Sequence, residues 1–191
     1  LFSEVKPGDF KYRDINGDNI IDDNDKVAIG YNTVAPEIYY SFHLGAEWKG
    51  LGIDAMFQGT GRYSAMLDTK SLFFPLIDNT TISQEYYDNR WTPENPEAKY
   101  PRLSSQSNEN NYQKNTAWIT DRSFLKLRSV ELYYKFPQTL LKKTKILNNA
   151  KIYVRGIDLL CFDKIKIADP EYYGAGYPLT RSVVAGLAID F

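Results

Sequence analysis

Apolar and polar residues alternate in five stretches of the chain, a pattern typical of β-strands with one apolar and one polar face. In the first stretch, residues 38–48, aromatic and aliphatic side chains alternate with Ser, His, Gly and Glu. The dipeptide Lys49-Gly50 has the composition of a tight turn, and the alternation resumes from Leu51. The pattern therefore predicts a β-hairpin over residues 38–61.

A third strand is expected over residues 124–136. Its apolar side chains follow one phase up to Leu127 and the opposite phase from Val130 onward. A change of phase inside a strand indicates one extra residue on that strand. The sequence therefore predicts a β-bulge near Arg128-Ser129.

Two more strands are expected towards the end of the chain. Residues 151–162 place Ile152 and Val154 on the outward face and Tyr153 and Arg155 on the inward face. The last strand begins at Arg181, and one of its faces is entirely apolar. That face consists of Val183, Ala185, Leu187, Ile189 and Phe191.

The length and the two faces of these strands favour a membrane-spanning sheet over a soluble one. Each strand has about 11 residues, enough to cross a bilayer at a tilt. The polar face mixes Gly, Ser, His, Gln and Asp, which suits a water-filled interior, and the final strand ends on an aromatic residue. The predicted fold class is all-β, an antiparallel transmembrane β-barrel segment. A final strand of a soluble β-sandwich is the alternative.

The connections between the expected strands alternate in length. Lys49-Gly50 and residues 137–150 are short, the latter with a helical turn near residues 140–143, whereas residues 62–121 and 163–180 are long. Outer-membrane barrels have short periplasmic turns and long extracellular loops. We therefore expect the C-terminus in the periplasm and residues 1–37, 62–121 and 163–180 outside the cell.

Composition narrows the possible classes of protein. The 191 residues carry 23 Lys+Arg and 24 Asp+Glu, and this near-neutral balance argues against nucleic-acid binding. A single cysteine, Cys161, excludes a disulfide framework within the chain. There is no run of about 18 apolar residues, and the first eight residues do not read as a signal peptide. The aromatic content of 15% is typical of a β protein.

Residues 14–25 match the ligand spacing of an EF-hand loop. Such a loop supplies oxygens from positions 1, 3, 5, 7, 9 and 12. Position 6 is Asn19 instead of the usual Gly, and Asn tolerates the left-handed conformation required there. We expect a structural Ca²⁺ site, with a solvated cluster of Asx turns as the alternative. The expected ligands are Asp14, Asn16, Asp18, Ile20 through its carbonyl, Asp22 and Asp25.

The long connection 62–121 is rich in aromatic residues. They offer ring faces for a substrate or a protein partner, and the alternative is that they pack the loop itself. The residues proposed for contact are Trp91, Tyr100, Tyr112 and Trp118.

No catalytic constellation is evident. His43 has no nearby nucleophile, and the carboxylates Glu47 and Asp54 fall on the same face of the hairpin without further catalytic signals. We do not expect the chain to be an enzyme.

Several motifs together resemble the C-terminal part of SusC/RagA-type TonB-dependent outer-membrane transporters. The resemblance covers the whole chain. It is carried by PGDFKYRDINGDNIIDDNDKVAIG (7–30), LGIDAMFQGTG (51–61), RWTPENPEAKYPRL (90–103), DRSFLKLRSVELYYKFP (121–137), AKIYVRGIDLLCF (150–162), Asp169-Pro170-Glu171 and the closing strand to Phe191.

This resemblance implies the last five or so strands of a plugged barrel of about 22 strands. The plug domain, the TonB-contacting segment and the signal peptide would precede Leu1. The implied protein lies in the outer membrane of a Gram-negative cell and imports oligosaccharides or peptides. It would work with a SusD-like surface lipoprotein and with TonB. The alternative function is a secreted, calcium-stabilised β-sandwich that binds carbohydrate.

Overall fold

The computed structural model describes residues 4–165, 167–172, 177 and 179–191. The chain divides into two compact units, and the chain passes between them three times. One unit contains Leu1–Thr33 and Ser64–Asp121, and the other contains Val34–Tyr63 and Arg122–Phe191. Within the described ranges, no helix is long and apolar enough to span a membrane.

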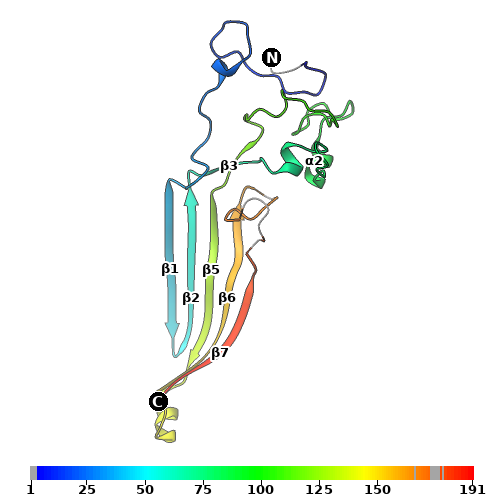
Figure 1. The fold of residues 1–191 in the computed structure, drawn as a ribbon. Helices are drawn as coiled ribbons and strands as arrows, with labels where there is room; N and C mark the ends of the chain where they lie inside the picture. Colours follow the sequence, from blue (N-terminus) through cyan, green and yellow to red (C-terminus); the bar gives the residue numbers. More distant parts are fainter. Residues whose placement is uncertain (1–3, 166, 173–176, 178) are drawn as a thin grey trace. The chain divides into compact units, whose positions relative to one another are not determined.

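The second unit is a single five-stranded sheet in which every neighbouring pair is antiparallel. The strand order is β1-β2-β5-β6-β7, and Figure 1 shows the five strands side by side. This confirms the predicted all-β, antiparallel class. The strands are β1 (Ile38–Trp48), β2 (Leu51–Gly61), β5 (Phe124–Lys135), β6 (Asn149–Asp163) and β7 (Ser182–Asp190).

Local backbone features match those expected from the sequence. Lys49 and Gly50, which join β1 to β2, both have positive φ (51° and 88°), as a two-residue hairpin turn of the primed type requires. Against β2, Ser129 pairs with Met56 and Leu127 pairs with Phe57, so Arg128 is the extra residue of a bulge on β5. The predicted hairpin and the predicted bulge are thus both present.

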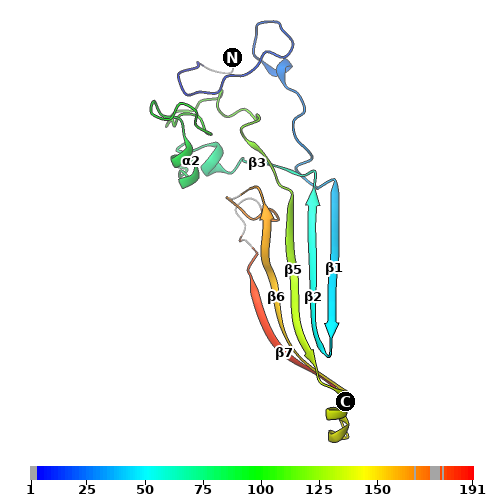
Figure 2. The same cartoon turned by 180° about the vertical axis from the view of Figure 1, so that it is seen from behind.

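Short and long connections leave opposite ends of this sheet. The β1–β2 turn, the helical turn α3 (Gln138–Leu141) with η2 (Lys142–Thr144), and the C-terminus lie at one end (Figures 1 and 2). The residues that follow β2 and β6 leave from the other end, because Thr60 pairs with Phe124 and Phe124 pairs with Asp163. This alternation agrees with the lengths read from the sequence.

The first unit has a core of its own, and the long connection expected at residues 62–121 contains short helices and strands. Its core is a stack of aromatic rings. The ring centroids of Tyr86 and Tyr100 lie 5.0 Å apart, and those of Tyr100 and Trp118 lie 5.6 Å apart. Phe10 meets Trp118 edge-on at 5.8 Å. Its elements are η1 (Asp23–Asp25), β3 (Ser64–Met66) paired with β4 (Ile119–Asp121), α1 (Lys70–Phe73) and α2 (Gln84–Asn89).

A buried carboxylate joins the two chain segments of this unit. The side chain of Asp9 is fully buried, and Arg102 Nε lies 2.8 Å from its Oδ1. Asn108 and Asn111 donate side-chain hydrogen bonds of 3.0 and 2.8 Å to the same oxygen. A buried charge is stable only with such partners. Residues 1–33 and 64–121 therefore fold together, whereas the sequence suggested two separate loops.

Candidate functional site

The register of the sheet separates its side chains into an apolar face and a polar face. Residues paired directly across two strands point to the same side. Phe42 pairs with Phe57, which pairs with Leu127, which pairs with Leu160. On the other side, Asp54 pairs with Glu131, which pairs with Arg155. Both faces are thus continuous across strands.

The apolar face is exposed along its whole width. Leu44 on β1 is 60% exposed, Leu132 on β5 is 53% exposed and Val183 on β7 is 70% exposed. Soluble monomers rarely leave so large a contiguous apolar surface uncovered. The members with high exposure on the five strands are Phe42, Leu44, Trp48, Leu51, Ile53, Leu132, Ile152, Val154, Leu160, Phe162, Val183, Leu187 and Ile189.

The polar face carries a network of ion pairs centred on Lys126. The side chain of Lys126 is only 3% exposed, and its Nζ lies 2.8 Å from Asp169 and 2.7 Å from Glu171. Arg128, the bulge residue, pairs with Glu171 and, at 2.9 Å, with Asp158. Two basic side chains of β5 therefore fasten the segment that follows β6 to the polar face.

Backbone contacts strengthen this attachment. Arg122 donates hydrogen bonds to the carbonyl oxygens of Pro170 (2.5 Å) and Glu171 (3.3 Å), and Pro170 is fully buried. The pKa values of Asp169 and Glu171 reflect burial and hydrogen bonding, which act in opposite directions. Burial raises them, but the hydrogen bonds from Lys126, and from Arg128 to Glu171, outweigh burial and hold both values below their usual range.

A second cluster of charged side chains on the same face is centred on Glu131. Glu131 accepts hydrogen bonds from Lys151 (2.7 Å) and Arg155, and a cavity of about 450 Å³ is lined by Glu131, Arg155, Arg128 and Asp54, among others. The sequence analysis did not foresee either cluster. The register pairs Glu131 with Arg155, whereas the partners of Lys126 lie in the segment after β6, outside the strand pairing.

The carboxylates considered for catalysis have basic partners instead. Glu47 pairs with Lys135 at 2.6 Å and accepts a hydrogen bond of 2.9 Å from Tyr133. Asp54 lies 2.9 Å from His43. Each acid is therefore engaged by its own neighbour on the polar face.

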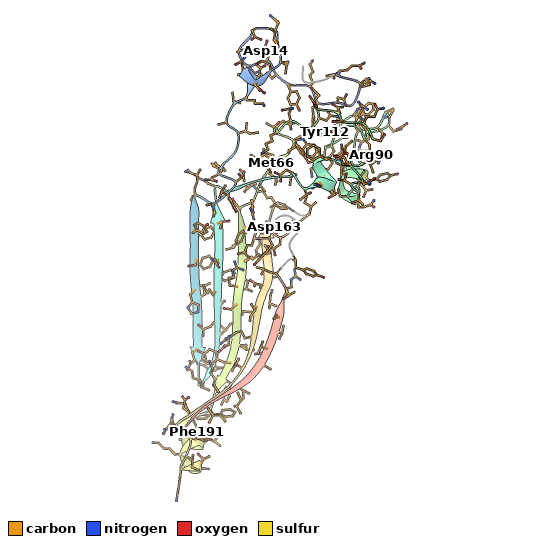
Figure 3. The ribbon with its side chains drawn as sticks, viewed as in Figure 1. Asp14, Met66, Arg90, Tyr112, Asp163 and Phe191 are labelled. Carbon is orange, nitrogen blue, oxygen red and sulfur yellow. The ribbon has the colours of Figure 1, made fainter. Side chains whose placement is uncertain are left out.

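The acidic loop 14–25 is closed by hydrogen bonds from backbone N–H groups to its carboxylates. Asp14 accepts from Gly17 (2.6 Å) and Asn19 (2.8 Å), and Asp25 accepts from Ile15 (2.7 Å). Asn19 has φ of 65°, the left-handed conformation expected at position 6. Asp14 lies in this loop beside η1 (Figure 3).

The carboxyl of Asp25 stays ionised in this arrangement. Hydrogen bonds from the backbone N–H groups of Asp22 and Ile15 lower its pKa. Within the described part of the chain, no group of three or more His, Cys, Asp or Glu side chains is already gathered closely enough to hold a metal ion.

The aromatic residues proposed for partner contact have different surroundings. Tyr100 and Trp118 are each only 1% exposed and form the core of their unit, as the packing alternative expects. Trp91 packs against Gly8: a Cβ at Gly8, which has φ of 89°, would lie 2.4 Å from the indole. Trp91 and Tyr112 are half-buried.

Two curated relatives cover nearly the whole chain. TonB-dependent receptor P26 of Formosa agariphila is 30% identical over 200 residues, which cover 96% of this chain and 20% of the relative. TonB-dependent receptor P3 of the same organism is 25% identical over 214 residues, covering 100% of this chain and 20% of that protein. The chain thus spans about a fifth of these relatives. No family model matches it.

Solved structures of a peptide transporter are also similar to this chain over most of its length. The RagAB peptide transporter has 28% sequence identity and a TM-score of 0.70, with 90% of this chain and 19% of that chain covered. The RagAB peptide importer in its closed-closed state has 27% identity and a TM-score of 0.70, with 93% and 20% covered.

The fold defines an antiparallel sheet segment of the kind found in RagAB. The comparisons confirm the resemblance of this chain to a segment of a SusC/RagA-type TonB-dependent transporter. These relatives are named as receptors and transporters, which agrees with the expectation that the chain is not an enzyme.

Proposed function

We propose that this chain forms part of the barrel wall, with attached extracellular loops, of a TonB-dependent importer in the outer membrane of a Gram-negative cell. The exposed apolar face on all five strands carries this proposal. In hydrocarbon such a face is stable, whereas in water it would promote aggregation. The polar face would line the interior, where its ion pairs meet water.

Most of the transporter would come from residues outside this chain. A transporter-sized barrel has about 22 strands around a plug, and the five strands here supply only part of its circumference. The plug and the TonB contact would belong to the rest of the protein. A SusD-like lipoprotein would meet the extracellular loops, and the cargo would be oligosaccharides or peptides. The RagAB neighbours are named as peptide importers, which favours peptides.

The alternative of a secreted β-sandwich fits the structure less well. A sandwich buries one face of each sheet against a second sheet. Here Val183 is 70% exposed, Leu187 is 58% exposed and Phe191 is 79% exposed. The residues that a sandwich would bury are thus the ones that face solvent.

Spin labelling of the full-length transporter in lipid vesicles tests the membrane assignment. Nitroxides placed one at a time at Val183, Val184, Ala185 and Leu187 should alternate in their environment, because these side chains alternate between the two faces. Labels at 183, 185 and 187 should collide mainly with dissolved oxygen, and the label at 184 mainly with a water-soluble nickel complex. Equal accessibility to the nickel complex at all four sites would contradict the proposal.

We also propose that loop 14–25 binds Ca²⁺ as a structural ion. Its oxygen donors are those that Ca²⁺ prefers, and a carboxylate has about four lone-pair sites, so Asp14 keeps some for a metal beside its two backbone hydrogen bonds. Asp14, Asn16, Asp18, Asp22 and Asp25, together with the carbonyl of Ile20, would hold it. The ion would offset the mutual repulsion of the loop carboxylates.

Removal of the ion should loosen this loop. With EGTA, or in the double variant D14A/D18A, cleavage of residues 14–25 by a nonspecific protease should become about tenfold faster, because local opening then costs less free energy. Cleavage is followed by mass spectrometry, with added Ca²⁺ restoring protection only in the wild type. The variant D68N, outside the loop, serves as the control. Identical cleavage with and without EGTA would argue against a cation in the loop.

A further inference from the structure

A cavity of about 730 Å³ lies within the first unit, between the acidic loop and residues 112–116. Every residue that lines it belongs to Leu1–Thr33 or Ser64–Asp121, so it is a feature of that unit alone. Tyr112 and Met66, two of its lining residues, are labelled in Figure 3. Neither the strand pattern nor the proposed cation site accounts for this cavity.

The charges on its wall are predominantly positive. Lys11, Arg13, Lys26 and Lys114 line the cavity together with only two acids, Asp22 and Asp25. Lys26 pairs with Asp23, which lies outside the wall. Lys11, Arg13 and Lys114 form no ion pair with any described residue, and their side chains are exposed.

The two acids of the wall are already engaged. Asp25 accepts hydrogen bonds from the N–H groups of Ile15 (2.7 Å) and Asp22 (3.0 Å), and Asp22 accepts from the N–H group of Asn24 (2.7 Å). These hydrogen bonds hold the two carboxylates in place. Four basic side chains against two carboxylates give the wall a net charge of +2.

Between the basic groups, the wall is aliphatic. Ile15 and Val27 are 46% and 57% exposed, so their side chains are available to a ligand in the cavity. A concave aliphatic surface with a few charged groups at its edge is typical of a ligand site. Its aliphatic members are Ile15, Ile21, Val27, Ile29 and Met66.

From these observations we propose that the cavity binds an acidic peptide segment with aliphatic side chains. The aliphatic side chains would lie against the apolar wall, and the carboxylates would pair with Lys11, Arg13 and Lys114. An acidic oligosaccharide would satisfy the cations but has no aliphatic side chains for the wall. The proposal rests on the proposed importer function and narrows its cargo to acidic peptides.

Binding to the full-length transporter in detergent tests this proposal. The probes are three fluorescein-labelled octapeptides with alternating sequence, (Glu-Leu)₄, (Gln-Leu)₄ and (Lys-Leu)₄, and a hexauronate. The acidic peptide should bind about tenfold more tightly than the neutral one, since several exposed ion pairs form together. This preference should shrink as salt rises from 50 to 500 mM.

Charge reversal on the wall should remove the preference. The double variant R13E/K114E should weaken binding of the acidic peptide at least tenfold and leave that of (Gln-Leu)₄ nearly unchanged. V27N should weaken both peptides alike, because it removes apolar contact. K143E, which changes an exposed lysine in η2 of the other unit, is the matched control and should bind like the wild type.

Three binding results would overturn the proposal. Equal affinity for acidic and neutral peptides, or an unchanged preference in R13E/K114E, would overturn the proposal, and so would tight binding of the hexauronate alone. Heat-modifiable migration on SDS gels, recorded for the same preparations, reports whether the barrel is folded. A folded barrel without acidic-peptide binding would refute this inference and leave the importer proposal standing.

Discussion

Replacing Leu44 with arginine should sharply reduce the folded transporter in the outer membrane. Leu44 lies in the middle of β1, on the apolar face, and is 60% exposed. A cation at mid-depth on the lipid face of a barrel costs about 2–4 kcal/mol. We expect less of the compact, heat-modifiable band on SDS gels and a lower midpoint of urea unfolding in lipid vesicles.

The neighbouring residue provides a matched control. His43 points to the polar face, where it lies 2.9 Å from Asp54, so an arginine there would pair with that acid. H43R should therefore fold at close to wild-type levels. If L44R and H43R are equally well folded, the apolar face does not contact lipid, and the importer proposal loses its main support.

Replacing Lys126 with methionine should release the segment that it fastens to the sheet. Methionine has a similar length but leaves Asp169 without its basic partner, and breaking a buried ion pair in this way costs about 3 kcal/mol. Amides of residues 167–172 should then exchange with solvent about a hundredfold faster. Hydrogen exchange of the full-length protein, read by mass spectrometry, measures this.

Two controls separate local release from misfolding. K135M removes the exposed partner of Glu47 and should leave exchange at residues 167–172 unchanged. If K126M fails to fold, D169N/E171Q removes the same ion pairs from the other side and should give the same faster exchange. Wild-type exchange rates in both K126M and D169N/E171Q would show that these pairs do not hold the segment.

The same contacts predict how acid acts on this segment. The pKa values of Asp169 and Glu171 are lower in the folded state than in the unfolded chain, where they are about 3.9 and 4.3. Their contribution to stability is therefore complete above those unfolded values. It is lost as pH falls through the lower, folded values. Exchange at residues 167–172, corrected for the intrinsic rate, should rise below about pH 4 in the wild type and change less in K126M.

Features that depend on neighbouring residues could be predicted from the sequence. Alternation of side chains predicted the two faces of β1 and β2, and the loss of phase after Leu127 predicted the bulge near Arg128-Ser129. The positive φ of Lys49, Gly50 and Asn19 also follows from local composition. Each of these features needs only a few consecutive residues to specify it.

Contacts between distant residues could not be predicted in this way. Arg102 reaches Asp9 across 93 positions, and Lys126 reaches Asp169 across 43. Nothing near Asp9 in the sequence marks it as a buried carboxylate. The burial of Tyr100 and Trp118 depends on the same long-range closure, because their core forms only when residues 1–33 and 64–121 meet.

The way the first unit is divided along the chain has a consequence for biogenesis. Its two parts are separated by the whole β1–β2 hairpin. During synthesis, Asp9 is therefore made about 90 residues before Arg102, its ion-pair partner. Until then that carboxylate remains hydrated and its segment has no aromatic stack to dock on. A truncated product that stops within the hairpin would therefore leave residues 1–33 without the segment that buries Asp9, and so more open to proteolysis.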